Sequence, residues 1–80
     1  MKYKVRDVVD LDDVLISPRA HASWHAAAAV GAQALPAVHP SLIPDEQGIW
    51  LPTGELEIFV EIAGHRISMK IPPSEWAWKQ

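Results

Sequence analysis

Two histidines lie four residues apart, at His21 and His25. On a helix this spacing brings both imidazoles to one face, where they would supply half of a metal site. The segment lacks the glutamate that follows the first histidine in the zinc metalloprotease motif. His39 or an acidic residue from elsewhere would have to complete the site. His21 and His25 are therefore candidate metal ligands, and two solvated helix histidines are the simpler interpretation.

Three aspartates, Asp10, Asp12 and Asp13, form an acidic group near the start of the sequence. A calcium loop would also need a glycine at its turn and a distant glutamate, and the spacing supplies neither. Apolar residues follow at helical spacing, and Asp10 would cap a single helical turn. Negative charge is favourable at such an N-terminus. The aspartates therefore predict a capped turn rather than a metal site.

Three glutamates, Glu55, Glu57 and Glu61, alternate along a predicted strand, with Arg66 and Lys70 on the strand that follows. Paired carboxylates can perform acid–base catalysis, but carboxylates beside basic residues are also typical of structural ion pairs. With the three aspartates, they would form an acidic surface suited to a basic groove of a partner. The two basic residues would neutralise much of that field, so we interpret the glutamates as structural.

Other kinds of chemistry have little support in the sequence. None of the serines lies in a nucleophile motif, and there is no glycine-rich phosphate loop. The absence of cysteine excludes disulfides and cysteine-based zinc sites. The formal net charge of −3 argues against direct nucleic-acid binding. We therefore expect no enzymatic activity and no cofactor.

The 80 residues predict one small domain, which would bury only about 60–65% of its unfolded surface. So small a core without disulfides favours an oligomer or a partner protein. Residues 20–44 contain no Asp, Glu, Lys or Arg, but they are rich in alanine and interrupted by proline. This is too weak a pattern for a membrane span. With no targeting signal recognised, we expect a cytoplasmic protein outside the membrane.

A helix over residues 18–34 would position the two histidines. Ser17 is a favourable N-cap, and proline is favoured at the first helical position. The inner face contains Ala20, Trp24, Ala28, Gly31 and Leu35. We expect Trp24 to anchor this face on a sheet. Gly31 costs about 1 kcal/mol in a helix interior, which close packing would explain.

The outer face of this helix has an unusual composition for a surface. It contains Arg19, Ala22, His25, Ala26, Ala29, Val30 and Gln33. A solvated helix face normally carries several charges, whereas this face carries Arg19 alone. It is therefore a candidate interface with another subunit or a partner protein, and an ordinary alanine-rich surface is the alternative.

Residues 55–71 alternate apolar and polar side chains on both sides of Gly64, which predicts a β-hairpin with one apolar face. That face contains Leu56, Ile58, Val60, Ile62, Ile67, Met69 and Ile71. A preceding short strand completes a predicted meander of residues 48–51, 55–62 and 66–71. Residues 2–6 also alternate, which predicts a first strand that reaches towards Val8 and is a candidate fourth strand at the sheet edge.

The hairpin has two plausible registers. A loop of residues 64–65 places glycine first, as a type II′ turn requires. A loop of residues 63–64 pairs Glu61 with Arg66, but it puts alanine at a positive φ, which a Cβ resists. Cross-strand pairs contribute about 0.2–1 kcal/mol each, similar to the turn penalty. We favour the loop of residues 64–65, and both registers keep the same apolar face.

Together these elements predict a single small α+β domain over residues 1–80, with one main α-helix packed on a small antiparallel β-sheet. Residues 36–47 are predicted to be a proline-rich connector, because proline recurs there and suits neither a helix nor a central strand. Residues 72–80 form a tail that contains Trp76 and Trp78. The tail is expected either to cover the open core or to expose its tryptophans as a binding anchor.

The function that we expect is a non-catalytic protein–protein interaction module that forms a homo-oligomer, most simply a homodimer. The candidate partner-binding residues are Trp76, Trp78, Phe59, Ala22, Ala26, Ala29 and Val30. Small proteins without motifs include the accessory and inhibitor proteins of phages, which act by binding a larger complex, and this is the specific form that we expect. The alternative is a histidine-based metal-binding protein or a small hydrolase that uses His21 and His25.

Overall fold

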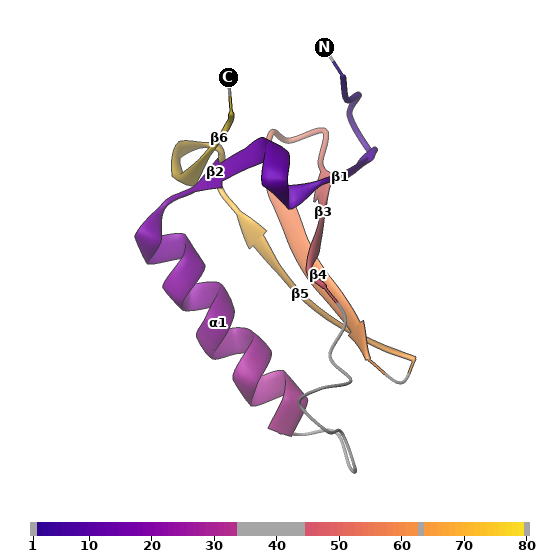
Figure 1. The fold of residues 1–80 in the computed structure, drawn as a ribbon, viewed down its shortest axis with the longest axis vertical. Coiled ribbons are helices and arrows are strands. Elements are labelled where there is room, and N and C mark those ends of the chain that lie inside the picture. The colour runs from indigo at the N-terminus through magenta and orange to yellow at the C-terminus, as the bar shows by residue number, and fades with distance from the viewer. Residues whose placement is uncertain (1, 34–44, 63, 80) are drawn as a thin grey trace.

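The computed structural model describes residues 2–33, 45–62 and 64–79 (Figure 1). One long helix and two small antiparallel sheets make up this part of the chain, which confirms the predicted α+β class. The elements in chain order are β1 (Val8–Val9), η1 (Leu11–Asp13), β2 (Val14–Ile16), α1 (Pro18–Gln33), β3 (Gln47–Trp50), β4 (Leu56–Ile62), β5 (His65–Ile71), η3 (Pro73–Glu75) and β6 (Trp76–Trp78). Leu35 and most of the predicted connector at 36–47 lie outside the described residues.

The larger sheet has the strand order β1-β3-β4-β5, and all of its neighbouring strands are antiparallel. An N-terminal strand does lie at its edge, but the predicted span of 2–6 is wrong, because the strand that pairs with β3 is Val8–Val9. A turn interrupts the alternating residues: the Asp7 N–H donates to the Lys4 carbonyl at 3.0 Å. Arg6 adopts a left-handed φ of 78°, which ends the extended backbone before the strand begins.

The β4–β5 hairpin corrects the predicted register. Ile62 pairs with His65, and Glu61 pairs with Arg66, so the loop comprises residues 63–64 rather than 64–65. Gly64 has a φ of 82°, a conformation that glycine adopts without strain. The predicted apolar face is retained, because the two registers differ by two residues and the side-chain period is two. Its buried residues are Leu56, Ile58, Val60, Ile62 and Ile71.

Helix α1 begins and is anchored as the sequence predicts. The Ser17 Oγ accepts a hydrogen bond from the Ala20 N–H at 3.1 Å, which is the geometry of an N-cap. Trp24 is 0% exposed, and the helix packs along β5 (Figure 1). A Cβ added to Gly31 would lie only 2.9 Å from the Cδ1 of Ile67. This distance confirms that the helix backbone approaches the sheet closely at the glycine.

The smaller sheet, formed by β2 and β6, departs from the prediction. Asp10 caps η1 as predicted, because its Oδ1 accepts a hydrogen bond from the Asp12 N–H at 2.9 Å. The chain after this turn forms strand β2, which was not predicted from the sequence. Val14 pairs with Trp78, and the ladder continues to Trp76. This pairing holds the C-terminal tail beside the segment that leads into α1 (Figure 1).

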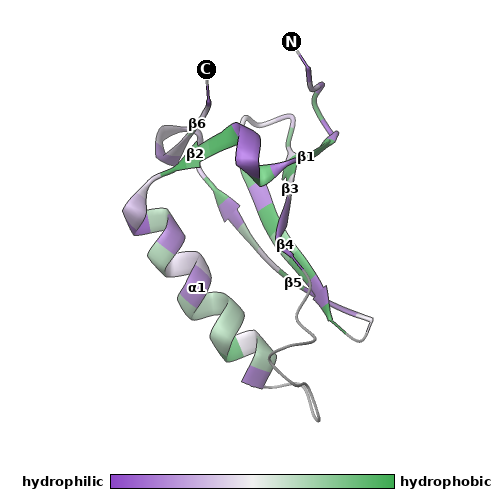
Figure 2. Cartoon of the chain, in the orientation of Figure 1, coloured by the Kyte–Doolittle hydropathy of each residue, from purple (hydrophilic) through white to green (hydrophobic). Residues whose placement is uncertain are grey.

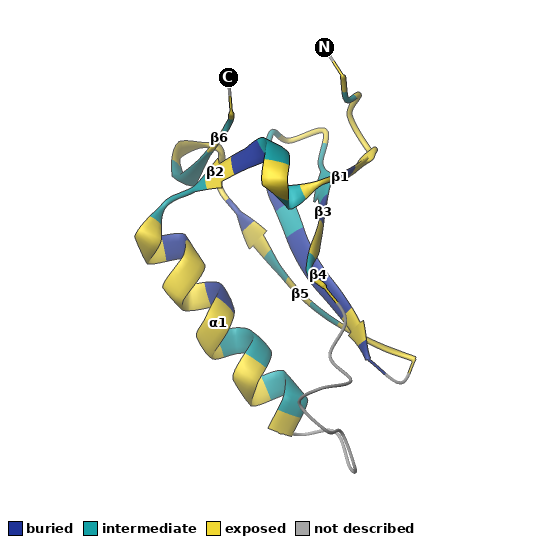
Figure 3. Ribbon diagram, in the orientation of Figure 1, coloured by how far each residue is buried: buried dark blue, intermediate teal, exposed yellow. Residues whose placement is uncertain are grey.

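The core lies between α1 and the larger sheet. Hydrophobic residues concentrate on β4 and β2 (Figure 2), and buried residues follow β4 and the side of α1 that faces the sheet (Figure 3). The opposite side of α1 is exposed along its length. The fold therefore presents one face of its long helix to the surroundings.

Candidate binding surfaces

The outer face of α1 is exposed at every position that the sequence assigns to it. These positions are Arg19, Ala22, His25, Ala26, Ala29, Val30 and Gln33. Val30 is 69% exposed, which leaves most of a branched apolar side chain in water. Among the 16 residues of α1, Arg19 carries the only formal charge when histidine is neutral. A face of this composition loses little electrostatic hydration when another protein covers it.

The two histidines of α1 lie next to each other at the surface. The ring centroids of His21 and His25 are 4.1 Å apart, and the ring planes are tilted by 47°. Both residues are exposed. Within the described ranges no group of three or more His, Cys, Asp or Glu side chains is arranged to hold a metal ion, and His39 lies outside them. The structure therefore places the two candidate metal ligands, His21 and His25, side by side. One chain provides two imidazoles at this position.

An aromatic cluster lies where the C-terminal tail meets the rest of the protein. It consists of Tyr3, Trp50, Trp76 and Trp78, each of which is half-buried. The Trp78 ring contacts the rings of Trp50 and Trp76 edge-on at centroid distances of 5.1 Å, and it stacks with Tyr3 at 5.5 Å. The Trp76 indole N–H donates to the Gly54 carbonyl at 3.1 Å. The two candidate tryptophans of the tail therefore pack against this protein, with part of each ring still in water.

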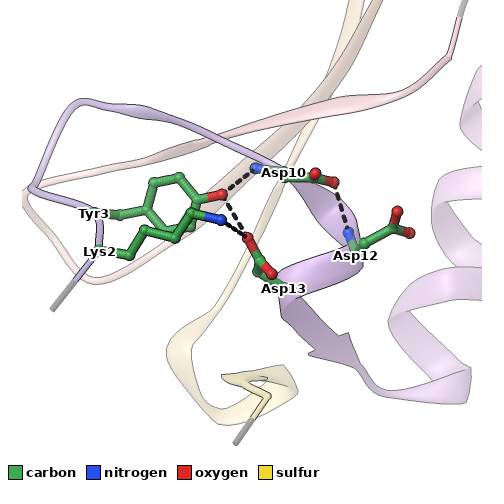
Figure 4. Close-up of polar contacts among 5 residues, drawn as sticks. All are labelled: Lys2, Tyr3, Asp10, Asp12 and Asp13. Atoms are coloured by element: carbon green, nitrogen blue, oxygen red, sulfur yellow. Dashed lines mark hydrogen bonds and ion pairs between the residues drawn. The ribbon is translucent and has the colours of Figure 1, made fainter.

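Hydrogen bonds and an ion pair fix the Tyr3 side chain of this cluster (Figure 4). Its hydroxyl donates to Asp13 Oδ2 at 2.6 Å and accepts from the Asp10 N–H at 3.2 Å. The Lys2 ammonium donates to the same Asp13 oxygen at 3.0 Å. The hydrogen bond from Tyr3, followed by that from Lys2, holds the pKa of Asp13 below its ordinary value. The hydrogen bond to Asp13 and its negative charge raise the pKa of Lys2.

A hollow of about 230 Å³ lies at the edge of the aromatic cluster. It is lined by Lys2, Tyr3, Asp13, Trp78 and Lys79. Asp13 is already engaged by two donors, so the polar contacts here serve to position the aromatic ring. Of the three aspartates, Asp10 caps η1 and Asp13 accepts the hydrogen bond from Tyr3.

The remaining candidate, Phe59, lies on the face of the sheet opposite the core. It is only 5% exposed, and the guanidinium of Arg66 lies over its ring with a Cζ-to-centroid distance of 4.3 Å. Arg66 also donates to Glu61 Oε1 at 2.7 Å. Glu55 accepts a hydrogen bond from the Thr53 hydroxyl at 2.8 Å. These glutamates therefore have structural partners, and Phe59 is covered by its own chain.

Sequence reasoning did not include Tyr3 and Trp50 among the candidate residues. Tyr3 reaches the cluster because the turn before β1 redirects the N-terminal segment, and Trp50 reaches it as the last residue of β3. The two tryptophans of the tail alternate with Ala77 along β6, which places them on one side of the strand. No pattern in the sequence indicated which segment would lie opposite them.

Comparison of the chain with protein-family models, with curated proteins and with solved structures finds no match. Within the described ranges, no helix combines the length and the hydropathy that a membrane crossing demands. The exposed helix face, the histidine pair and the aromatic cluster are the features of the described residues that bear on function.

Proposed function

We propose that this protein is a non-catalytic protein-interaction module that self-associates through the outer face of α1. The observation that carries the proposal is that this face is exposed throughout and has a single formal charge, on Arg19. Small side chains such as Ala22, Ala26 and Ala29 allow two helices to pack at the short end of the usual 8–10 Å range of axis separations. Burying Val30 on association would add a hydrophobic contribution.

The strength of this association follows from the size of the face. A helix of 16 residues is about 24 Å long. Contact restricted to such a helix is smaller than the about 800 Å² per partner of a standard interface. We therefore expect a weak dimer whose population depends on protein concentration. Each chain would also gain stability by mass action as the dimer forms.

The test is a sedimentation-velocity series over protein concentrations from about 10 μM to about 1 mM. The weight-average mass of the parent should rise from 8.9 kDa towards twice that value. Ala26→Glu places a charge at the centre of the face without a large loss of helix propensity, and it should remain monomeric. Ser68→Glu is the matched control, because it adds the same charge at an exposed position on β5. It should behave as the parent does.

Circular dichroism of both variants would establish that the helix is retained. A parent chain that stays at 8.9 kDa up to the highest concentration would refute self-association. An Ala26→Glu variant that associates as strongly as the parent would refute the assignment of the interface to this face.

A further inference from the structure

We propose that a divalent transition metal, with zinc as the reference ion, bridges two copies of this chain through the His21–His25 pair of each. This inference rests on the proposed self-association and adds a ligand to it. His25 belongs to the outer face of α1, and the two imidazoles lie with their centroids 4.1 Å apart at the helix surface. His21 is not among the residues of that face, so the histidine pair lies at the edge of the proposed interface.

The histidine pair has the chemistry of half a zinc site. Zinc is bound by imidazole nitrogens at about 2.0–2.1 Å, almost always with four ligands when the site is structural. Histidines four residues apart on a helix project from the same face, so side-chain rotation can aim one nitrogen of each ring at a common ion. One chain supplies two such ligands. The helix that carries them contains no Asp or Glu to complete the set.

A second copy completes the coordination sphere by symmetry. In a two-fold dimer the same surface patch meets itself, so a His21–His25 pair close to the axis faces an identical pair and yields four nitrogens. The residues next to His25 on the outer face, Ala22 and Ala29, are small and exposed. They leave room for two helices to approach within the reach of an imidazole. The metal would thus convert a weak helix contact into a closed four-ligand site.

The expected size of the effect follows from linkage. A metal that binds the dimer alone multiplies its association constant by about 1 + [L]/Kd, which is about 100-fold at a free zinc concentration of 100 times the Kd. Binding should saturate at one metal for two chains. A simple chelate formed within one chain would instead saturate at one metal per chain and leave the mass unchanged.

The experiment combines calorimetric titration of the full chain with zinc chloride and sedimentation velocity in zinc and in EDTA. At a concentration where the EDTA sample is monomeric, zinc should raise the mass from 8.9 kDa towards twice that value, with about 0.5 metal per chain. His21→Ala and His25→Ala should each abolish the mass shift. His65→Ala removes an exposed histidine from the start of β5 and should leave the shift unchanged.

Three results would overturn the bridged site: saturation at one metal per chain without a change of mass, no heat of binding, or a mass shift that survives in His25→Ala. The samples in EDTA measure self-association without metal. The experiment therefore tests the proposed self-association and the proposed zinc bridge independently. A parent that dimerises in EDTA but gains nothing from zinc retains the proposed function and refutes the metal bridge.

Discussion

Replacing Gly31 with alanine should destabilise this protein, although the same change stabilises most helices. Gly31 lies on the inner face of α1, and a Cβ at this position would meet three atoms of one side chain. The distances are 2.9 Å to the Cδ1 of Ile67 and 3.0 Å to both its Cγ1 and its Cγ2. Since Cγ1 and Cγ2 are both attached to the β-carbon of Ile67, rotation about χ1 cannot move both away at once.

The magnitude is the difference between two opposing terms. Alanine is favoured over glycine in a helix interior by about 0.8–1.0 kcal/mol. Forcing an extra methyl group into a packed contact typically costs about 1–3 kcal/mol. The free energy of unfolding of Gly31→Ala should therefore fall by about 0–2 kcal/mol, where an uncrowded glycine would show a gain of about 1 kcal/mol.

Urea unfolding, followed by circular dichroism and tryptophan fluorescence, measures this difference. With an m-value of about 1 kcal/mol/M, a loss of 1 kcal/mol lowers the midpoint by about 1 M. The decisive comparison is made in the Ile67→Ala background, which removes all three crowding atoms. Gly31→Ala should then stabilise by about 1 kcal/mol, so the double-mutant cycle should give a coupling energy of about 1–3 kcal/mol.

Ala29→Gly measures the difference in helix propensity between alanine and glycine at an exposed position of the same helix. It should lower the free energy of unfolding by about 1 kcal/mol. A Gly31→Ala variant that is more stable than the parent, or that has the same effect in both backgrounds, would refute the reasoning. Either result would mean that α1 does not press its backbone against Ile67.

Two further predictions concern polar contacts. Ser17→Ala removes the acceptor for the Ala20 N–H and should cost about 1 kcal/mol in thermal or urea unfolding, whereas Ser23→Ala should be close to neutral. The pKa of Asp13 is lowered in the folded state, so the ionised Asp13 carboxylate stabilises the fold. This stabilisation is present above the ordinary pKa of 3.8 and is lost as the pH falls through the lower folded-state pKa. Asp13→Asn should remove it. The urea midpoints of parent and variant should therefore differ at neutral pH and converge in acid, and a constant difference from pH 7 to pH 2 would contradict this assignment.

Short-range signals in the sequence predict the elements of this fold well. The Ser17 cap and the periodicity that places Trp24 inward depend only on neighbours within one or two helical turns. Alternation likewise identifies β4 and β5 and their buried face, since it needs no knowledge of the partner strand. The exposed face of α1 follows from the same periodicity, so one candidate surface was predictable as a whole.

Pairing between distant segments was not predictable in the same way. Strand β2 has three residues, Val14–Ile16, which is too short for alternation to outweigh the helical spacing of the apolar residues around it. Its partner β6 lies at the opposite end of the chain. The aromatic cluster depends on this pairing and on a left-handed Arg6, a conformation that few residues other than glycine adopt. Tyr3 and Trp50 were therefore missed as cluster members.

The register of the β4–β5 hairpin involves contacts of Arg66 that a comparison of turn types does not include. The turn preference favours a loop of residues 64–65, and the charge pairs favour a loop of residues 63–64. Taken alone, these two effects are similar in size, so they leave the two registers close in energy. The observed register places Arg66 opposite Glu61 and over the ring of Phe59. An exposed cation–π contact contributes about 0.5–1 kcal/mol, and the exposed ion pair between Arg66 and Glu61 contributes about 0.2–1 kcal/mol. These two contacts of Arg66 are similar in size to a turn preference, and both favour the observed register.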